Sequence, residues 1–314
     1  MNAKRLFFFC LFLAALGGFF YWQYTYYRTP LAVDNSLFST GNYQDETVVA
    51  GLVKNGIPSI DDADYESIAE ADMYLDDAGL GLALESAGRA WFFPYQILNW
   101  HEIVNTSIDG VPMAVTYCPL CASGIVYRSQ VDGQTLTFGT TGKLWNNNLV
   151  MHDEQTGSWW VQILGQGISG VYDGRELDQY PSIEMTWDEF KGSYRSASVL
   201  SRETGYDRDY TSNPYGDYQE SLDIHYALTH MDDRLYAKDR VFGVIAGDEV
   251  VAYPEKIIFE QGEIAGTLSG SGFTISTDED TILFETESDN LKTVQSYWFC
   301  FVASYPKTSI YLGT

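Results

Sequence analysis

The stretch GLALESAGRAWFFPYQI, residues 81–97, decides the predicted fold. An apolar run, a glycine turn, a second apolar run and Pro94 follow one another in it, which predicts a strand, a turn, a strand and a helix begun by proline. The stretch VFGVIAGDEVVAYPEKI, residues 241–257, has the same order, with Pro254 in the place of Pro94. The two stretches therefore predict one structural unit that occurs twice.

A second pair of segments supports this duplication. Four positions in one segment have the same spacing as four in the other: Trp187, Phe190, Tyr194 and Val199 against Trp298, Phe301, Tyr305 and Ile310. Thr186 and Glu189 form a capping box for the first of these two helices. We expect a first repeat over residues 77–236 and a second, shorter repeat over 237–314, against the alternative that two β-hairpins resemble each other by chance.

The fold class follows from the segments between these units. Residues 135–138 alternate between polar and apolar, and Gly133 and Gly174 mark tight turns, a pattern typical of antiparallel strands. The sequence thus predicts an α+β, β-rich fold built from internally duplicated strand–turn–strand–helix units with antiparallel sheets.

The N-terminus predicts a membrane anchor. Lys4 and Arg5 precede an apolar and aromatic segment, residues 6–27, which is long enough to span a bilayer. Basic residues before such a segment favour a cytoplasmic N-terminus and place the bulk of the chain in a periplasmic or extracellular compartment. A cleaved signal peptide is the alternative. Residues 28–76 are rich in Asp, Ser and Gly and are interpreted as a stalk with a short helix around 67–74.

Charge and composition exclude some partners. The chain has 18 basic and 43 acidic residues and a net charge of -25, so its surface repels nucleic acid and anionic lipid. Aromatic residues make up 15% of the chain, which is enough for a substantial core and argues against disorder.

The candidate chemistry lies in Cys118-Pro119-Leu120-Cys121, at the end of an apolar strand-like run. Of the other two cysteines, Cys10 lies in the N-terminal apolar segment and Cys300 in an aromatic helix, where we expect it to be a small buried apolar residue. The pair Cys118 and Cys121 has three interpretations: redox-active thiols, one side of a metal site, or a structural disulfide. Residues 122–127 are strand-like, so the pair has no following helix to lower a thiol pKa.

His101 is the candidate third member of the site. It lies on the predicted helix 94–104 with Ile97, Leu98 and Val104 on the same face, so it points inward as either a core histidine or a ligand near the sulfurs. Two thiolates and an imidazole would suit a soft metal, of which copper is our expectation. We interpret Glu102 as a solvated helix residue.

Several motifs together resemble the family known as domain of unknown function 3179. The residues that carry the resemblance are Asn99–Asn105, Val115–Cys121, Phe138–Gly142, Leu149–Met151, Thr204–Tyr215 and Tyr297–Phe299. Some members of that family are named as candidate selenoproteins, which implies redox or soft-metal chemistry. Ala122 stands where the family usually has glycine.

Three functional hypotheses follow. The first is a thiol oxidoreductase in which Cys118 or Cys121 attacks and the other resolves, with a protein or small-molecule thiol as partner. The second is a copper-binding protein that uses Cys118, Cys121 and His101. The third is a structural surface module with a disulfide.

Overall fold

The computed structural model describes residues 43–313. The predicted anchor at residues 6–27, Cys10 and the first part of the predicted stalk lie outside the described residues. Within residues 43–313, no helix is both long enough and apolar enough to cross a membrane.

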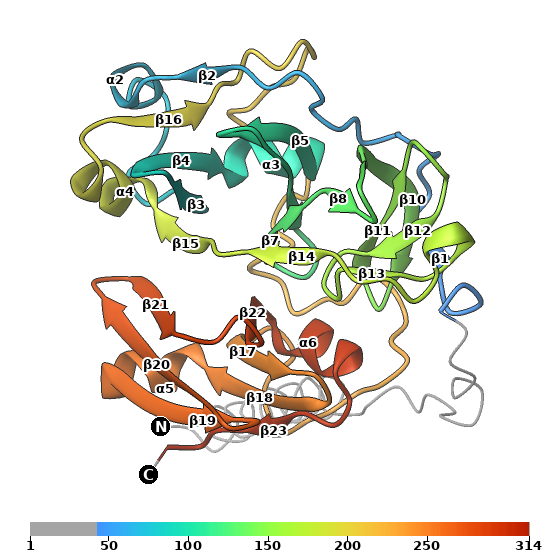
Figure 1. The fold of residues 1–314 in the computed structure, drawn as a ribbon, viewed down its shortest axis with the longest axis vertical. Helices are drawn as coiled ribbons and strands as arrows, with labels where there is room; N and C mark the ends of the chain where they lie inside the picture. Colours follow the sequence, from blue (N-terminus) through green and yellow to red (C-terminus); the bar gives the residue numbers. More distant parts are fainter. Residues whose placement is uncertain (1–42, 314) are drawn as a thin grey trace, which may run out of the picture. The chain divides into compact units, whose positions relative to one another are not determined.

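Five small sheets form the fold and are arranged as a five-bladed β-propeller (Figure 1). The first blade has the strand order β15 (Ile183–Thr186), β3 (Leu80–Ser86), β4 (Arg89–Pro94), β16 (Ala197–Leu200) and β2 (Tyr65–Glu66). The second has the order β14 (Asp178–Tyr180), β7 (Ser123–Arg128), β6 (Val111–Cys118) and β5 (Ile103–Ile108). The third has the order β1 (Val48–Val49), β10 (Phe138–Trp145), β11 (Asn148–Asp153), β12 (Trp159–Val161) and β13 (Gln166–Gly167).

The last two blades come from the C-terminal part of the chain. One has the order β22 (Lys292–Tyr297), β17 (Arg240–Ala246), β18 (Glu249–Pro254) and β23 (Ser309–Ile310), and the other the order β19 (Glu263–Leu268), β20 (Ser271–Asp278) and β21 (Thr281–Thr286). A separate small hairpin joins β8 (Gln130–Val131) to β9 (Gln134–Thr135). The helices are all short: α2 (Ile68–Ala71), α3 (Tyr95–His101), α4 (Trp187–Ser193), α5 (Glu255–Gln261), α6 (Trp298–Ser304) and the 3-10 turn η2 (Gly170–Tyr172).

The two halves of the fold have the same order of elements, as the sequence predicts. The series β3–β4–α3–β5–β6–β7 followed by β15–α4–β16 corresponds to β17–β18–α5–β19–β20–β21 followed by β22–α6–β23. The pairing agrees as well, because β15 is antiparallel to β3 as β22 is to β17, and β16 is parallel to β4 as β23 is to β18. Strand β15 contacts β21, and the equivalent strand β22 contacts β7, so the halves make reciprocal contacts.

Local sequence explains the repeated unit. The β3–β4 hairpin turns through Ala87 and Gly88, whose φ angles are 48° and 74°, and a two-residue turn with both φ angles positive matches the twist of antiparallel strands. In α4, Thr186 and Glu189 form the predicted capping box. Phe190 of that helix packs on Phe92 of β4, with ring centroids 4.7 Å apart.

The structure changes two of the sequence-based expectations. The β-rich, largely antiparallel character is confirmed, but the short helices form no layer of their own and the sheets are propeller blades. Strands β1 and β2 pair with β10 and β16, and Ile60 is only 1% exposed, so residues 48–66 belong to the folded unit rather than to a stalk. The helix expected around residues 67–74 is present as α2, with a capping box at Ser67.

Candidate functional site

The cysteine turn joins two central strands of the second blade. Cys118 ends β6 and Ser123 begins β7, and the N–H of Cys121 donates to the carbonyl of Cys118 at 3.1 Å. Ala122 has a φ of 47°, in the left-handed region that favours glycine. This conformation explains why glycine suits the position after the second cysteine. Both cysteine side chains are buried.

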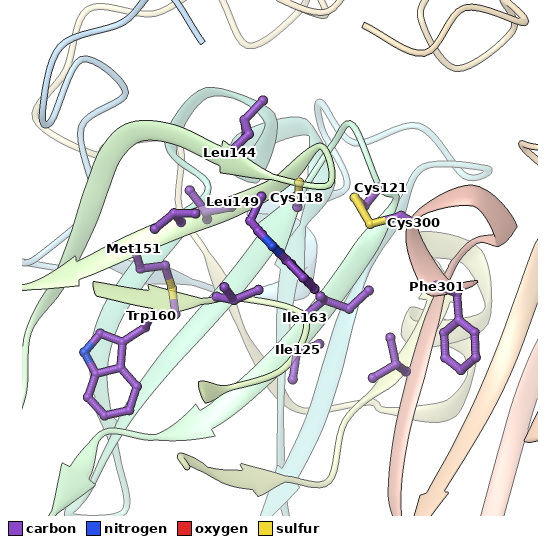
Figure 2. Close-up of a cluster of buried hydrophobic side chains, with 14 of the residues drawn as sticks. Cys118, Cys121, Ile125, Leu144, Leu149, Met151, Trp160, Ile163, Cys300 and Phe301 are labelled. Carbon is purple, nitrogen blue, oxygen red and sulfur yellow. A yellow bond between two sulfur atoms is a disulfide. The ribbon is translucent and has the colours of Figure 1, made fainter. Parts of the chain in front are cut away.

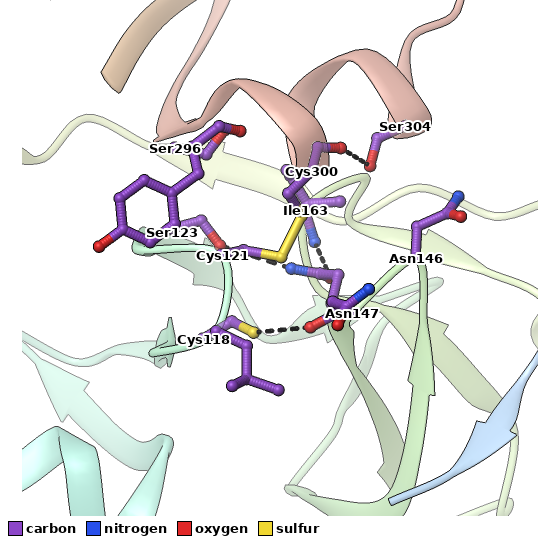
Figure 3. The surroundings of a disulfide bond; sticks show 12 residues. Cys118, Cys121, Ser123, Asn146, Asn147, Ile163, Ser296, Cys300 and Ser304 are labelled. Carbon is purple, nitrogen blue, oxygen red and sulfur yellow. Dashed lines mark hydrogen bonds between the residues drawn. A yellow bond between two sulfur atoms is a disulfide. The ribbon is translucent and has the colours of Figure 1, made fainter. Parts of the chain in front are cut away.

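The disulfide partner of Cys121 is Cys300, not Cys118. The two bonded sulfurs are 2.12 Å apart and the residues are separated by 179 positions in the sequence (Figure 3). Cys300 lies on α6 of the second half, and the N–H of Tyr297 just before that helix donates to the carbonyl of Cys121 at 2.8 Å. The structure does not show the Cys118–Cys121 bond of the structural-disulfide interpretation, one of the three, and the expectation that Cys300 is only a small apolar residue is wrong. The Cys121–Cys300 bond ties the first half of the chain to the second.

Cys118 is a free thiol beside this disulfide. It is 1% exposed, and its sulfur donates to the carbonyl of Asn147 at 3.5 Å (Figure 3). Burial, and then the negative charge of Glu102, raise the pKa of the Cys118 thiol to about 12. Backbone N–H groups of Cys121, Leu149 and Leu120 lie near the sulfur and oppose this shift. Figure 2 shows Cys118, Cys121 and Leu149 in one apolar cluster, which keeps the thiol protonated and dry.

Glu102 is the titratable neighbour of this thiol. It follows α3 with a φ of 58°, which turns its side chain inward, and it is only 6% exposed. Burial raises the pKa of the Glu102 carboxyl to about 7, and a hydrogen bond from Tyr215 Oη to Glu102 Oε1, 2.5 Å long, lowers it. The interpretation of Glu102 as a solvated helix residue is wrong, because α3 ends at His101, three residues before the end of the predicted helix 94–104.

A cavity of about 120 Å³ lies next to Glu102 and the cysteine turn. Its walls are formed by aliphatic side chains and about as many polar ones: Ala50, Leu52, Ile57, Glu102, Leu120, Thr140, Gly142, Lys143, Leu144, Leu149, Tyr215, His225 and Tyr226. Leu120 and Leu149 separate this space from Cys118, since their backbone N–H groups lie near its sulfur. The cavity and the thiol thus share one wall.

A long segment without helix or strand, residues 201–239, closes the site from one side. We call it the linker segment, because it joins β16 of the first half to β17 of the second. Tyr215 donates to Glu102, Tyr218 Oη donates to the carbonyl of Leu120 at 3.0 Å, and the N–H of Tyr226 donates to Asn147 Oδ1 at 2.9 Å. Loops of this length inside a folded unit are uncommon and are usually functional.

A buried ion-pair network supports the turn from the other side. Arg240 at the start of β17 donates from Nη1 to the carbonyl of Ala122 at 2.7 Å. Its guanidinium also pairs with Glu184 and, through Nε at 3.2 Å, with Glu255. The Glu184 side chain is 8% exposed and accepts a 2.7 Å hydrogen bond from Tyr95. Charges from both halves therefore meet beside the disulfide.

His101 is buried, as predicted, but both of its ring nitrogens are occupied. Nδ1 lies 2.8 Å from the carbonyl of Pro58 and Nε2 lies 2.6 Å from Tyr210 Oη. In the part of the chain that the structure describes, no group of three or more His, Cys, Asp or Glu side chains is arranged to hold a metal. The copper site of Cys118, Cys121 and His101 stays a prediction, because these three side chains are not grouped as metal ligands in the described structure.

The fold and the site define a class of protein: a β-propeller with a buried free thiol next to a disulfide that joins its two halves. The chain belongs to the family described as protein of unknown function DUF3179, whose profile matches residues 54–293. Neither the curated proteins nor the solved structures contain a match to it.

Two members of this candidate site, Cys118 and Cys121, are the residues that the sequence singles out for chemistry, whereas Cys300 and Glu102 are expected there in other roles. Cys300 was the remaining cysteine outside the N-terminal segment, so an odd thiol count was a signal that it could pair. Tyr215 lies in the resemblance motifs but gives no local sign that it reaches Glu102.

Proposed function

We propose that this protein carries out thiol–disulfide exchange and that Cys118, Cys121 and Cys300 form one exchange centre. The observation that supports this most is a free thiol in the same four-residue turn as one half of a disulfide. A thiol so close in sequence to a disulfide sulfur is a natural intramolecular nucleophile.

The proposed exchange step conserves atoms and electrons. The Cys118 thiolate attacks Cys121 Sγ, the bond between Cys121 and Cys300 breaks, and the electron pair leaves on Cys300 Sγ. That sulfur takes up the proton that Cys118 lost. The product holds a Cys118–Cys121 disulfide and a free Cys300 thiol, so the protein itself is neither oxidised nor reduced. Net electron transfer requires a partner. A partner dithiol that attacks the protein disulfide is oxidised to a disulfide, and the protein is left with two reduced thiols.

The resting centre is held unreactive by its surroundings. With a pKa of about 12, only roughly one Cys118 in 10⁵ is a thiolate at pH 7. Two changes would raise that fraction: neutralisation of the Glu102 carboxylate, and movement of the linker segment that brings water to the sulfur. We propose that substrate binding supplies one or both.

The chain also supports an extracytoplasmic setting. Lys4, Arg5 and the apolar segment 6–27 favour a membrane anchor with the cysteine centre on the outer side. A disulfide of this kind persists in an oxidising compartment. The equal order of elements in the two halves supports an internal duplication, in which the first half keeps the Cys-x-x-Cys turn and the second half contributes Cys300.

The disulfide itself favours a second candidate function, a structural module. A bond across 179 residues restricts the unfolded chain strongly, so a purely stabilising role has a physical motive. The exchange function requires that Cys118 forms a disulfide at some stage, whereas the structural function does not.

Peptide mapping under non-reducing conditions tests the proposal. In Cys300→Ala, mild oxidation should convert the two remaining thiols of the turn into a Cys118–Cys121 disulfide. Cys118→Ala is the matched control, because it should keep the Cys121–Cys300 bond under the same treatment. If Cys118 stays reduced in Cys300→Ala while the variant is folded, the exchange proposal fails and the structural candidate remains.

A further inference from the structure

The cavity beside Cys118 has a ligand-binding feature that the exchange step does not use. Glu102 is nine-tenths buried, and its Oε1 accepts from Tyr215. Among residues 43–313, Oε2 of Glu102 has no protein hydrogen-bond partner, and it does not belong to the fully enclosed unpartnered atoms, so it reaches the open space of the cavity that Glu102 lines. A largely buried carboxylate with one oxygen facing a cavity can accept a hydrogen bond or an ion pair from a cation that binds there.

The basic residues that line the same cavity do not supply this cation. The Lys143 ammonium lies over the ring of Trp159, 5.0 Å from its centroid. His225 packs edge-on against Tyr218, with ring centroids 4.5 Å apart. The charge partner of Glu102 is therefore missing from the described chain, and the cavity next to it is where that partner would bind.

The size of the cavity limits the ligand. A volume of about 120 Å³ equals the room that about four water molecules take in the liquid. Aliphatic side chains form about half of the walls, and two of them, Leu120 and Leu149, lie between the cavity and the Cys118 sulfur. A ligand that fits has about four non-hydrogen atoms, an amine for Glu102, an apolar middle and an end that faces the thiol.

We propose that the cavity binds a small aminothiol, with its ammonium group on Glu102 and its sulfur directed toward Cys118. This assignment rests on the proposed exchange function and names its small-molecule substrate. A two-carbon aminothiol has the chain N–C–C–S, which matches the four-atom length. The bound ammonium neutralises the carboxylate that opposes ionisation of Cys118, so ligand binding and thiol activation are coupled.

The chemical step is a disulfide exchange. When the ligand is supplied as its symmetrical disulfide, one aminothiol half occupies the cavity and the other half extends out of it. Displacement of the Leu120 and Leu149 wall then lets the Cys118 thiolate attack the sulfur of the bound half, and the disulfide bond of the ligand breaks. One half becomes a mixed disulfide on Cys118, and the other half leaves as a thiolate that takes up a proton. Two electrons pass from the protein thiol to the ligand disulfide.

Rates of mixed-disulfide formation on Cys118 in the full-length protein test this proposal. The two probes are bis(2-aminoethyl) disulfide and its neutral counterpart bis(2-hydroxyethyl) disulfide, compared at pH 8 and quantified by peptide mass. After correction for their rates with a free peptide thiol, the amine probe should react about tenfold faster with the wild type, the gain that one charge-assisted hydrogen bond provides. Glu102→Gln should lose this preference. Glu249→Gln is the matched control, because Glu249 is an exposed carboxylate in the second half that accepts from the N–H of Ser269.

A probe without sulfur separates amine binding in the cavity from disulfide exchange at Cys118. Propylamine should raise the melting temperature of the wild type but not of Glu102→Gln, and propanol should raise neither. If both disulfides react with Cys118 at equal corrected rates in wild type and Glu102→Gln, the exchange function stands and the aminothiol site is overturned. If propylamine binds but neither disulfide reacts, the amine pocket stands and the exchange function fails. If propylamine does not bind and no preference is seen, the cavity holds water only.

Discussion

Removal of the inter-half disulfide should be the most destabilising single change at the cysteine centre. In Cys300→Ala the bond to Cys121 is lost, and the unfolded chain regains the freedom of a loop of 179 residues. Chain-entropy arithmetic for a loop of that length gives about 5 kcal/mol at 25 °C, the upper end of what disulfides contribute. The reciprocal contacts of β15 with β21 and of β22 with β7 remain, so the variant should still fold.

Urea unfolding of the full-length protein, followed by tryptophan fluorescence, measures this loss. We expect the free energy of unfolding to fall by about 3–5 kcal/mol and the melting temperature by about 10 °C or more. The wild type, with its disulfide kept reduced in both the folded and the unfolded state, should behave like Cys300→Ala. Cys118→Ala is the control: it removes a buried sulfur but keeps the bond, and it should cost about 1–2 kcal/mol.

Equal urea midpoints for Cys300→Ala and Cys118→Ala would contradict the predicted contribution of the disulfide to stability. That result would mean either that the bond between Cys121 and Cys300 is absent in the folded protein or that the halves are already so restricted when unfolded that the loop term vanishes. Peptide mapping of the wild type tells these two causes apart.

Three further predictions concern the surroundings of the centre. Because burial raises the pKa of Glu102 from 4.5 to about 7, the ionised carboxylate opposes folding, so its burial costs nothing below pH 4.5 and progressively more as the pH rises to 7. Glu102→Gln should therefore be more stable than the wild type by about 3 kcal/mol at pH 8 and nearly equal to it at pH 4 in urea unfolding. Arg240→Leu should cost about 3–5 kcal/mol by the same assay, because it leaves the buried Glu184 carboxylate without its cation; a loss below 1 kcal/mol would show that the pair is solvated. Tyr215→Phe releases the linker segment from Glu102 and should speed alkylation of Cys118 by iodoacetamide several-fold; an unchanged rate would mean that this hydrogen bond does not control access.

The sequence predicted what depends on neighbours along the chain. The hairpin and proline pattern of residues 81–97 and 241–257 produced the same order of elements in both halves, because turn chemistry and strand alternation act over a few residues. The capping box of Thr186 formed for the same reason. The number of blades could not be predicted, because β10 to β13 are inserted into the first half and have no counterpart in the second.

The site was only half predictable because its other members are distant in sequence. Cys300 approaches Cys121 only once α6 lies against the β6–β7 turn, and no spacing rule connects residues 179 positions apart. Glu102 turns inward because the backbone takes a left-handed conformation there, which the periodicity of the preceding helix does not show. The charge network at Arg240 likewise joins the two halves and cannot be read from either alone.

The most direct test of the exchange centre is to find out whether Cys118 exchanges with the disulfide in the wild-type protein. The protein is equilibrated with a small dithiol and its disulfide over a range of potentials, quenched with acid, alkylated and mapped under non-reducing conditions. The account predicts the Cys121–Cys300 bond at rest and, at intermediate potentials, a fraction of molecules with a Cys118–Cys121 bond and an alkylated Cys300. If Cys121–Cys300 converts directly into two thiols at every potential and Cys118 is never found in a disulfide, the account is contradicted.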